Sequence, residues 1–136
     1  MLYMAMWGNA GVNAHSICTI DVTNPKETFK RISSSLITGG HRDGEMDIAQ
    51  FRDPSQLYSD ADGNIYVADS GNHCIRRITP EGIVETTLGM PGTSGWKDGT
   101  KEEALFNMPT GIGISSDGSV YVADFNNNRI RKLSIN

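Results

Sequence analysis

The chain has 136 residues and carries 12 Lys and Arg against 16 Asp and Glu, which gives a formal net charge of −4 at pH 7. This length fits one ordinary domain, and the acidic balance disfavours a nucleic-acid partner, whose phosphates attract clustered cationic side chains. No apolar run approaches the roughly 20 residues that a membrane-spanning helix needs, so membrane insertion is not expected. The 15 Gly and 5 Pro residues fall in short polar clusters between runs of Val, Ile and Tyr, a pattern typical of many strands and turns.

Residues 2–37 predict three strands, at 2–5, 16–22 and 28–32. Residues 9–14 are interpreted as an insertion between the first two strands. The sequence Asn24-Pro25-Lys26 predicts a turn before the third, because Pro presets the backbone angle that such turns require.

Residues 38–92 predict a long leading loop and then four strands, which we call a, b, c and d. These are expected at 56–59, 65–68, 74–79 and 83–88. Asp62-Gly63, between strands a and b, is a strong hairpin signal because both central residues of such a turn need positive φ. Pro80-Glu81-Gly82 predicts the turn between strands c and d.

Residues 93–136 repeat the same pattern as far as strand c, with strands expected at 111–114, 120–123 and 129–134. The match to the preceding unit is gapless, and residues 40–81 share fifteen identities with residues 95–136. The identical residues of the first copy are Gly40, Asp43, Gly44, Ala49, Phe51, Pro54, Asp62, Gly63, Tyr66, Val67, Ala68, Asp69, Asn72, Ile75 and Arg76. Repeats of this length indicate solenoids, propellers or other arrays.

The sequence therefore predicts an all-β fold of ten strands, arranged as about two and a half β-propeller blades of four antiparallel strands each. The blades are assigned as a partial blade b-c-d over 2–37, a full blade a-b-c-d over 38–92 and a partial blade a-b-c over 93–136. Glycines in strand a, such as Gly111, are expected at the crowded inner end, where neighbouring backbones approach closely.

Residues 54–76 and 109–114 resemble NHL repeats, through the patterns Pro54-x-x-Leu57, Asp62-Gly63-Asn64-Ile65-Tyr66-Val67-Ala68-Asp69-Ser70-Gly71-Asn72-His73-x-Ile75-Arg76 and Pro109-x-Gly111-Ile112-x-Ile114. The Asp-Gly loops at 40–51 and 95–106 are similar to a long-loop subtype of secreted bacterial NHL proteins and of teneurin ectodomains. The resemblance implies a bacterial protein that is secreted, periplasmic or on the cell surface.

The resemblance also implies a six-bladed ring closed by shared strands, which ten strands cannot complete. We therefore expect either that the chain belongs to a longer protein that supplies the missing propeller blades, or that it self-associates through open blade edges. Cys18 and Cys74 fall in predicted strands without metal-type spacing, and both are interpreted as free, small hydrophobic residues.

Alternating strand directions place the b-c and d-a loops at one face of the propeller, and loops on a rigid scaffold often carry binding residues. All three histidines of the chain are predicted at this face. The candidate ligand-binding residues are His15, His41, His73, Trp96, Asp43 and Asp98. The alternative for Asp43 and Asp98, each followed by Gly, is a role in folding their loops.

The remaining polar groups have structural interpretations. Asp69 and Asp124 are expected to close their own turns as Asx turns. A calcium site at residues 59–64 is disfavoured because the distal Glu of such loops is absent. The cationic side chains of strand c are expected at solvated outer positions rather than at an RNA-binding surface. These cations are Arg76, Arg77, Arg129, Arg131 and Lys132.

No catalytic set is found: the sequence lacks a nucleophile elbow and a His-Glu-x-x-His motif, so neither a catalytic residue nor a cofactor is predicted. The favoured function is a binding module with a protein or glycan ligand. The alternatives are part of a hydrolase- or lyase-type enzyme, whose central site would be completed by missing blades, and an RNA-binding NHL propeller.

Overall fold

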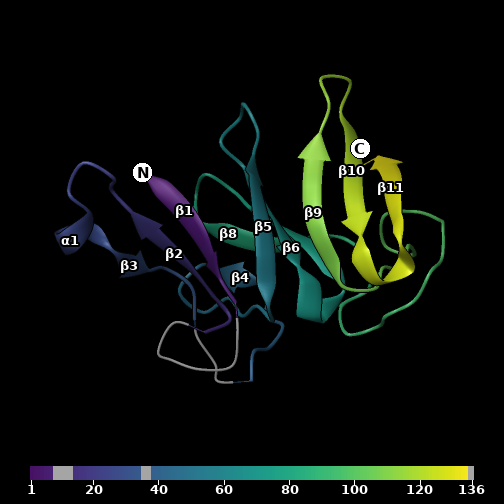
Figure 1. Cartoon of the computed structure of the whole chain (residues 1–136), viewed down its shortest axis with the longest axis horizontal. Coiled ribbons are helices and arrows are strands. Elements are labelled where there is room, and N and C mark those ends of the chain that lie inside the picture. The colour runs from purple at the N-terminus through teal and green to yellow at the C-terminus, as the bar shows by residue number, and fades with distance from the viewer. Residues whose placement is uncertain (8–13, 35–37, 135–136) are drawn as a thin grey trace.

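The computed structural model describes residues 1–7, 14–34 and 38–134, which form three antiparallel sheets that fan out side by side (Figure 1). The prediction of an all-β, blade-like fold is confirmed. Within the described residues no helix is long and apolar enough to span a bilayer. The insertion predicted at 9–14 lies, except for Ala14, outside the described residues.

The first sheet has the order β1 (Leu2–Met6), β2 (Ser16–Ile20) and β3 (Lys30–Arg31). A short helix, α1 (Pro25–Thr28), replaces the turn predicted at this point. Thr28 holds the helix to the end of β2, because its hydroxyl donates to the carbonyl of Asn24 at 2.7 Å and accepts from the N–H of Asp21 at 2.9 Å. The third strand therefore spans only two residues instead of the predicted 28–32.

The second sheet has the order β4-β8-β7-β6-β5 and contains all four predicted strands of residues 38–92. Its strands are β4 (Gly44–Glu45), β5 (Pro54–Ser59), β6 (Ile65–Asp69), β7 (Cys74–Ile78) and β8 (Ile83–Leu88). The sequence did not predict β4, which lies in the long leading loop. This loop folds back over the outer edge of β8, where Gly44 pairs with Val84 and the N–H of Met46 donates to the carbonyl of Gly82 at 2.9 Å.

The third sheet has the order β9 (Pro109–Ile114), β10 (Ser119–Asp124) and β11 (Arg129–Ser134). Together with β4, the described residues thus form eleven strands rather than the expected ten. Strands β1, β5 and β9 lie next to one another at the side from which the three sheets fan out (Figure 1).

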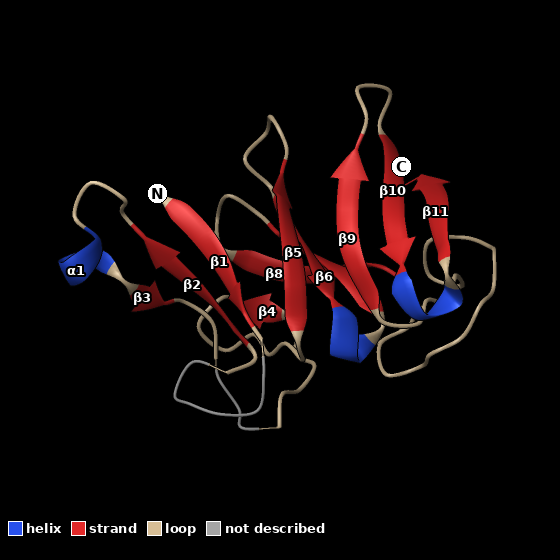
Figure 2. Cartoon of the chain, in the orientation of Figure 1, coloured by secondary structure: helices blue, strands red, loops and turns tan. Residues whose placement is uncertain are grey.

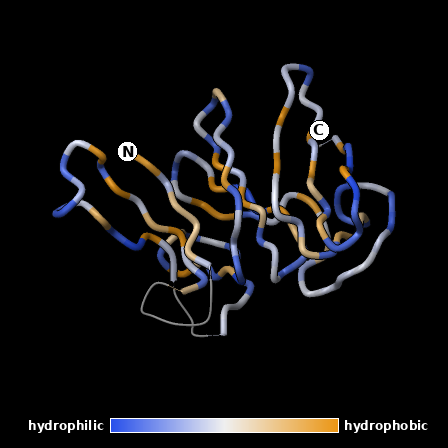
Figure 3. The backbone as a smooth tube through the Cα atoms, viewed as in Figure 1, coloured by the Kyte–Doolittle hydropathy of each residue, from blue (hydrophilic) through white to orange (hydrophobic). Residues whose placement is uncertain are grey.

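The hydrophobic core consists of two layers, one between each pair of neighbouring sheets. The layer between the first and second sheets includes Ile17, Ala49, Phe51, Ile65, Val67, Ile78 and Val84. The layer between the second and third includes Tyr66, Ala68, Ile75, Leu88, Ala104, Phe106, Ile112, Val120 and Val122. Because side chains alternate along a strand, β6 sends Val67 into one layer and Tyr66 into the other. Apolar segments accordingly follow the strands, and most loop tips are hydrophilic (Figure 3).

The close backbone approach expected at the strand-a glycines is not found: Gly111 is near side chains only, and Gly113 has open space around it. A Cβ on Gly111 would lie 2.8 Å from Oε1 of Gln56, the same oxygen that accepts from the N–H of Ile112 at 2.8 Å. A Cβ on Gly113 would meet nothing within 4 Å. A side chain at position 111 would therefore displace the Gln56 side chain, whereas one at position 113 would meet no neighbour.

Candidate functional site

The b-c turns and the long loops before β5 and β9 lie together at one end of the sheets. The turns are the 3₁₀ segments η1 (Ser70–Asn72) and η2 (Phe125–Asn127), at the lower side of Figure 2, whereas the β5–β6 and β9–β10 hairpins lie at the upper side. Each turn is tied to its loop, because the side-chain amides of Asn72 and Asn127 donate to the carbonyls of Gly40 and Gly95, both at 2.8 Å. We call this end, formed by residues 38–42, 70–73, 89–97 and 125–128, the loop face.

Asp69 at the end of β6 is buried and has three donors. Its Oδ1 accepts from the backbone N–H of Arg52 at 2.8 Å, and its Oδ2 accepts from Nδ2 of Asn72 at 2.8 Å and Nη1 of Arg76 at 2.7 Å. Burial raises the pKa of Asp69, while Arg76 and the N–H donors oppose this effect. The predicted Asx turn is wrong: the η1 turn is closed by its backbone, with His73 in the left-handed conformation.

Arg76 is fully buried, so its predicted place at a solvated position is wrong. Besides Asp69, its guanidinium donates to Oδ1 of Asp43 and to two backbone carbonyls, those of Gln50 and Arg42, at 2.7–3.0 Å. It also lies 4.7 Å from the ring centroid of Phe51. A guanidinium can be buried at this site because each of its five N–H donors has an acceptor.

The third sheet repeats this network 55 residues later. Nη1 of Arg131 donates to Oδ2 of Asp124 at 2.9 Å and to the carbonyl of Leu105 at 2.9 Å. Nη2 of Arg131 donates to Oδ1 of Asp98 at 2.7 Å and to the carbonyl of Lys97 at 2.9 Å. Arg131 is therefore also buried rather than solvated, and most of the repeated polar residues build the interior of each blade.

The candidate residues Asp43 and Asp98 differ in their hydrogen bonds and in their exposure. Oδ2 of Asp43 accepts from the N–H and the hydroxyl of Thr86 in β8, at 3.0 and 2.9 Å, so this carboxylate joins the long loop to β7 and β8. Asp98 binds Arg131, but its side chain is 82% exposed, against 39% for Asp43. Both carboxylates lie toward the outer edge of a sheet because the long loop folds around that edge.

His15 and His73 occupy matching positions that link neighbouring sheets. Nδ1 of His15 accepts from the N–H of Asp53 at 3.0 Å, and Nδ1 of His73 accepts from the N–H of Met108 at 3.1 Å. An accepting Nδ1 must be unprotonated. Burial, together with the charge of Arg52, lowers the pKa of His73 against the opposing effect of Asp124, and so keeps the imidazole neutral near pH 7. His15 is almost completely buried, while His73 retains partial exposure.

His41 and Trp96, which occupy the same place in their two loops, have different surroundings. Nε2 of His41 lies 2.8 Å from the hydroxyl of Thr86, and burial and the nearby Arg76 lower the pKa of His41. Trp96 is 59% exposed, and the guanidinium of Arg129 lies 3.6 Å from its ring centroid. No pattern in the sequence indicated this Trp96–Arg129 pair, because neither residue is repeated in the other copy and the contact joins a loop to β11.

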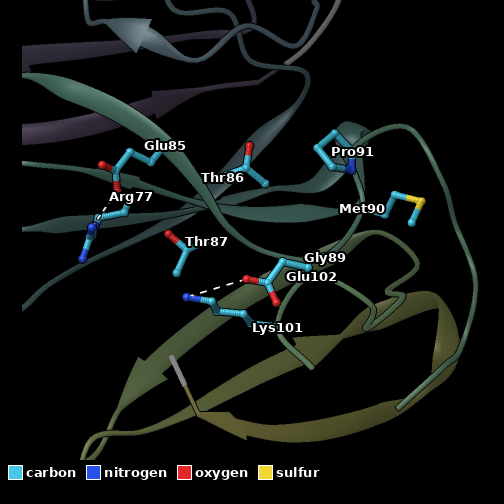
Figure 4. Close-up of a pocket in the computed structure, with 9 residues that line it drawn as sticks. All are labelled: Arg77, Glu85, Thr86, Thr87, Gly89, Met90, Pro91, Lys101 and Glu102. Atoms are coloured by element: carbon cyan, nitrogen blue, oxygen red, sulfur yellow. Dashed lines mark hydrogen bonds and ion pairs between the residues drawn. The ribbon is translucent and has the colours of Figure 1, made fainter. Parts of the chain in front are cut away.

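A polar pocket that the sequence did not predict lies between β7, β8 and the loop before β9 (Figure 4). It has a volume of about 390 Å³ and is lined by the nine residues labelled in the figure. Its charges are matched, since Arg77 pairs with Glu85 at 2.5 Å and Lys101 with Glu102 at 3.7 Å. The buried Nε of Arg77 has no hydrogen-bond partner among the described residues. The charged side chains that line the pocket thus carry no net charge.

Other groups considered from the sequence have structural roles here. Asp60 in the suggested calcium loop accepts from the N–H groups of Asp62 and Asn64 at 3.0 and 2.9 Å, as a turn residue does. Cys18 and Cys74 are free and buried, and burial raises the pKa of the Cys74 thiol well above its usual value. In the part of the chain that the structure describes, no group of three or more His, Cys, Asp or Glu side chains is arranged to hold a metal ion.

Comparison with known proteins identifies the repeat. The NHL repeat model matches residues 51–78 and 106–133. The chain is 35% identical over 104 residues, 76% of its length, to the Arabidopsis thaliana protein SUPPRESSOR OF QUENCHING 1, chloroplastic, and 39% identical over 83 residues, 60% of its length, to NHL repeat-containing protein 2 of Gallus gallus. It spans only 10% and 11% of the lengths of these relatives.

Among solved structures, the chain is similar to one described as an auxiliary nutrient binding protein from Bacteroides thetaiotaomicron. The two share a TM-score of 0.75 and 30% sequence identity, over 90% of this chain and 33% of the other. The present chain therefore matches about a third of the length of that solved chain.

Proposed function

Because the chain belongs to the NHL-repeat β-propellers, we propose that it forms part of a larger propeller that binds a protein or glycan ligand through the loop face. In this proposal residues 2–37, 38–92 and 93–136 form a partial, a full and a partial blade. The solved relative named as a nutrient binding protein supports a binding role in general. The ligand and the face that contacts it are our inference.

The observation that carries this proposal is the exposed Trp96 stacked against Arg129 at the loop face. Trp and Arg are the side chains that most often dominate the energy of binding interfaces. A ring held in place by a guanidinium also loses little conformational freedom when a ligand stacks on it.

The six candidate residues divide into two roles under this proposal. Trp96 and the partly exposed His41 contact the ligand directly. His15, His73, Asp43 and Asp98 hold the loops in position through the bonds described above. This division follows the general rule that a repeated framework carries loops whose individual residues determine specificity.

A printed array of oligosaccharides tests the glycan form of the proposal. We expect the chain to bind a defined set of glycans and Trp96→Ala to lose at least about tenfold in affinity. The matched control is Phe29→Ala, which removes an aromatic ring that is 44% exposed, beside α1 and away from the loop face. Equal binding by Trp96→Ala and the unmodified chain would exclude the Trp96 platform.

A protein ligand is tested by placing a photoreactive amino acid at position 41 or, as the control, at position 29. Cross-linking to one purified partner from position 41 alone is the expected result. Cross-linking from both positions with equal yield, or from position 29 alone, would count against the loop face.

A further inference from the structure

Arg52, which lies just before β5, uses its backbone as its counterpart in the third sheet, Asn107, does. In both sheets the N–H of this residue donates to the buried Asp at the end of strand b, at 2.8 and 2.7 Å. Its carbonyl accepts from the N–H of the second residue of the 3₁₀ turn, which is Gly71 in η1 at 2.8 Å and Asn126 in η2 at 3.0 Å. The blade framework therefore uses only the backbone at this position and leaves the side chain free to differ.

The side-chain stem of Arg52 packs between two glycines. A Cβ on Gly71 would overlap Cγ of Arg52 and lie 2.9 Å from its Cδ, and a Cβ on Gly39 would lie 3.0 Å from Cα, Cβ and Cγ of Arg52. In the third sheet the pair is exchanged as a whole, because Oδ1 of the shorter Asn107 accepts from Nδ2 of Asn126 at 3.3 Å. The stem of Arg52 is thus confined where it leaves the backbone, so less conformational freedom remains to be lost when its guanidinium binds a ligand.

Arg52 is exposed, and no hydrogen bond or ion pair joins its guanidinium to the residues that the structure describes. The neighbouring acid, Asp53, lies instead beside His15, with its Oδ1 3.2 Å from Nδ1 of that ring. The two arginines of β7, by contrast, are each paired with a carboxylate. Arg52 thus presents an unused fork of N–H donors at the surface.

The loop face around Arg52 contains cations but no acids. Arg52 belongs to this face because it packs on Gly39 and Gly71. The four segments that define the face include the exposed Arg42 and Lys97 but neither Asp nor Glu, although the whole chain has a net charge of −4. The acids at the ends of these segments are bonded to the buried arginines of strand c, and they are Asp43, Asp69, Asp98 and Asp124. An anionic group of a ligand is therefore attracted to this face.

The chemistry of this face suits a sugar carboxylate. The fork of a guanidinium matches the two oxygens of one carboxylate, so a single Arg can hold it. A nucleic acid, by contrast, needs several cations along its phosphates. Hydroxyl and amide side chains can hydrogen-bond sugar hydroxyls. Such side chains are exposed on the same face at Thr38, Thr93, Ser94, Asn126 and Asn128.

We propose that Arg52 binds the carboxylate of an acidic sugar, so that the ligand of the loop face is a glycan that contains uronic acid. This inference rests on the proposed function and narrows its ligand to one class. Two N–H groups of the guanidinium donate to the two carboxylate oxygens, while the backbone bonds of Arg52 remain unchanged. Neutral glycans and acidic peptides are the competing ligands that the experiment separates.

Calorimetry with the trimer of galacturonic acid and with its methyl ester tests the proposal, because the ester keeps the sugar but loses the charge. The original chain is expected to bind the acid about ten- to a hundredfold more tightly than the ester, since hydrogen bonds to a charged group are among the strongest. Arg52→Gln should lose that preference and bind both forms with the affinity that the original chain has for the ester.

Two variants separate this contact from general effects of charge and folding. Lys26→Gln removes an exposed cation from α1, away from the loop face, and should leave both affinities unchanged. Arg52→Asn combined with Gly71→Asn installs the pair that the third sheet already uses, so the turn should fold and the preference for the acid should still be lost.

The pKa of His73 provides a second reading. Burial and the positive charge of Arg52 lower this pKa, and a carboxylate bound to Arg52 offsets that charge. An NMR titration should therefore show a higher pKa of His73 with the acid trimer than with the ester, and no such difference in Arg52→Gln.

Equal affinity of the original chain for the acid and the ester would overturn the proposal, as would an equal loss of affinity for the acid in Lys26→Gln and Arg52→Gln. Tighter binding of an acidic peptide or of single-stranded RNA than of the acid trimer would assign Arg52 to another class of ligand. Binding of neutral glycans alone, still weakened by Trp96→Ala, would remove this inference and leave the proposed function standing. The absence of all glycan binding up to about 1 mM would remove the glycan form of the proposed function together with this inference.

Discussion

The second and third sheets share the same interior but differ at their borders. Arg76 and Arg131 make matching bonds to an Asp at the end of the neighbouring strand and to the long loop. Their neighbours in strand c differ: Ile75 is fully buried, whereas Ile130 is 68% exposed. The repeated sequence thus specifies the inside of a blade, while the elements packed around it decide how exposed and how stable the same residues are.

The largest difference is expected when the buried arginines are removed. Arg76→Ala leaves Asp69 buried without its charge partner and should lower the free energy of unfolding by about 3–5 kcal/mol. Arg131→Ala leaves Asp124 equally buried without its charge partner, but it should cost somewhat less because its other partner, Asp98, is exposed to water and can be resolvated. Urea denaturation followed by circular dichroism measures the free energy of unfolding of both variants. Equal losses would contradict the claim that the outer edges of the second and third sheets support their arginines differently.

A smaller difference separates the two loop carboxylates. Asp43→Ala removes bonds to both Arg76 and Thr86, and we expect it to destabilise the chain by about 2–3 kcal/mol. Asp98→Ala removes only the bond to Arg131 at an exposed site and should cost at most about 1 kcal/mol. Denaturation curves of the two variants, recorded under identical conditions, provide the comparison. A larger loss of stability for Asp98→Ala than for Asp43→Ala would contradict the claim that bonds to β8 give Asp43 the greater structural role.

The smallest effect concerns the links between sheets and depends on pH. The pKa of His73 is lowered on folding. The contribution of neutral His73 to the stability of the folded chain is therefore complete above the unfolded pKa of about 6.5, and it is lost as the pH falls through the folded pKa. Acidification from pH 7.5 to pH 5 should therefore weaken the link to Met108, worth about 1 kcal/mol.

The variant His73→Asn serves as the control, because Asn128 occupies the same position in the third repeat and does not titrate. Its stability should vary less between pH 7.5 and pH 5 than that of the original chain, as measured by urea denaturation at both values. An unchanged pH dependence would remove His73 from this role.

Much of the fold could be predicted from the sequence, because strand alternation and turn residues are local signals. The four strands of residues 38–92 and the three of residues 93–136 are observed close to their predicted positions. Strand β4 escaped prediction because it has only two residues and forms by pairing with β8.

The polar residues were harder to interpret, because their partners lie far away in the sequence. Asp69 accepts from the N–H of Arg52, which is 17 residues earlier, and Asp43 binds Arg76, which is 33 residues later. An alternating cation in a strand suggests a solvated face, yet Arg76 points into the blade. The repeat itself held the missing signal: Asp43, Asp69 and Arg76 recur together as Asp98, Asp124 and Arg131.

The central claim is that β7 and β11 are equivalent strands with different neighbours on their outer side. Hydrogen–deuterium exchange of the backbone amides is the most direct test of this claim. We predict strong protection of β7, which is paired on both sides, and faster exchange along β11, which is paired with β10 alone among the described residues. Equal protection of β7 and β11 would contradict the account.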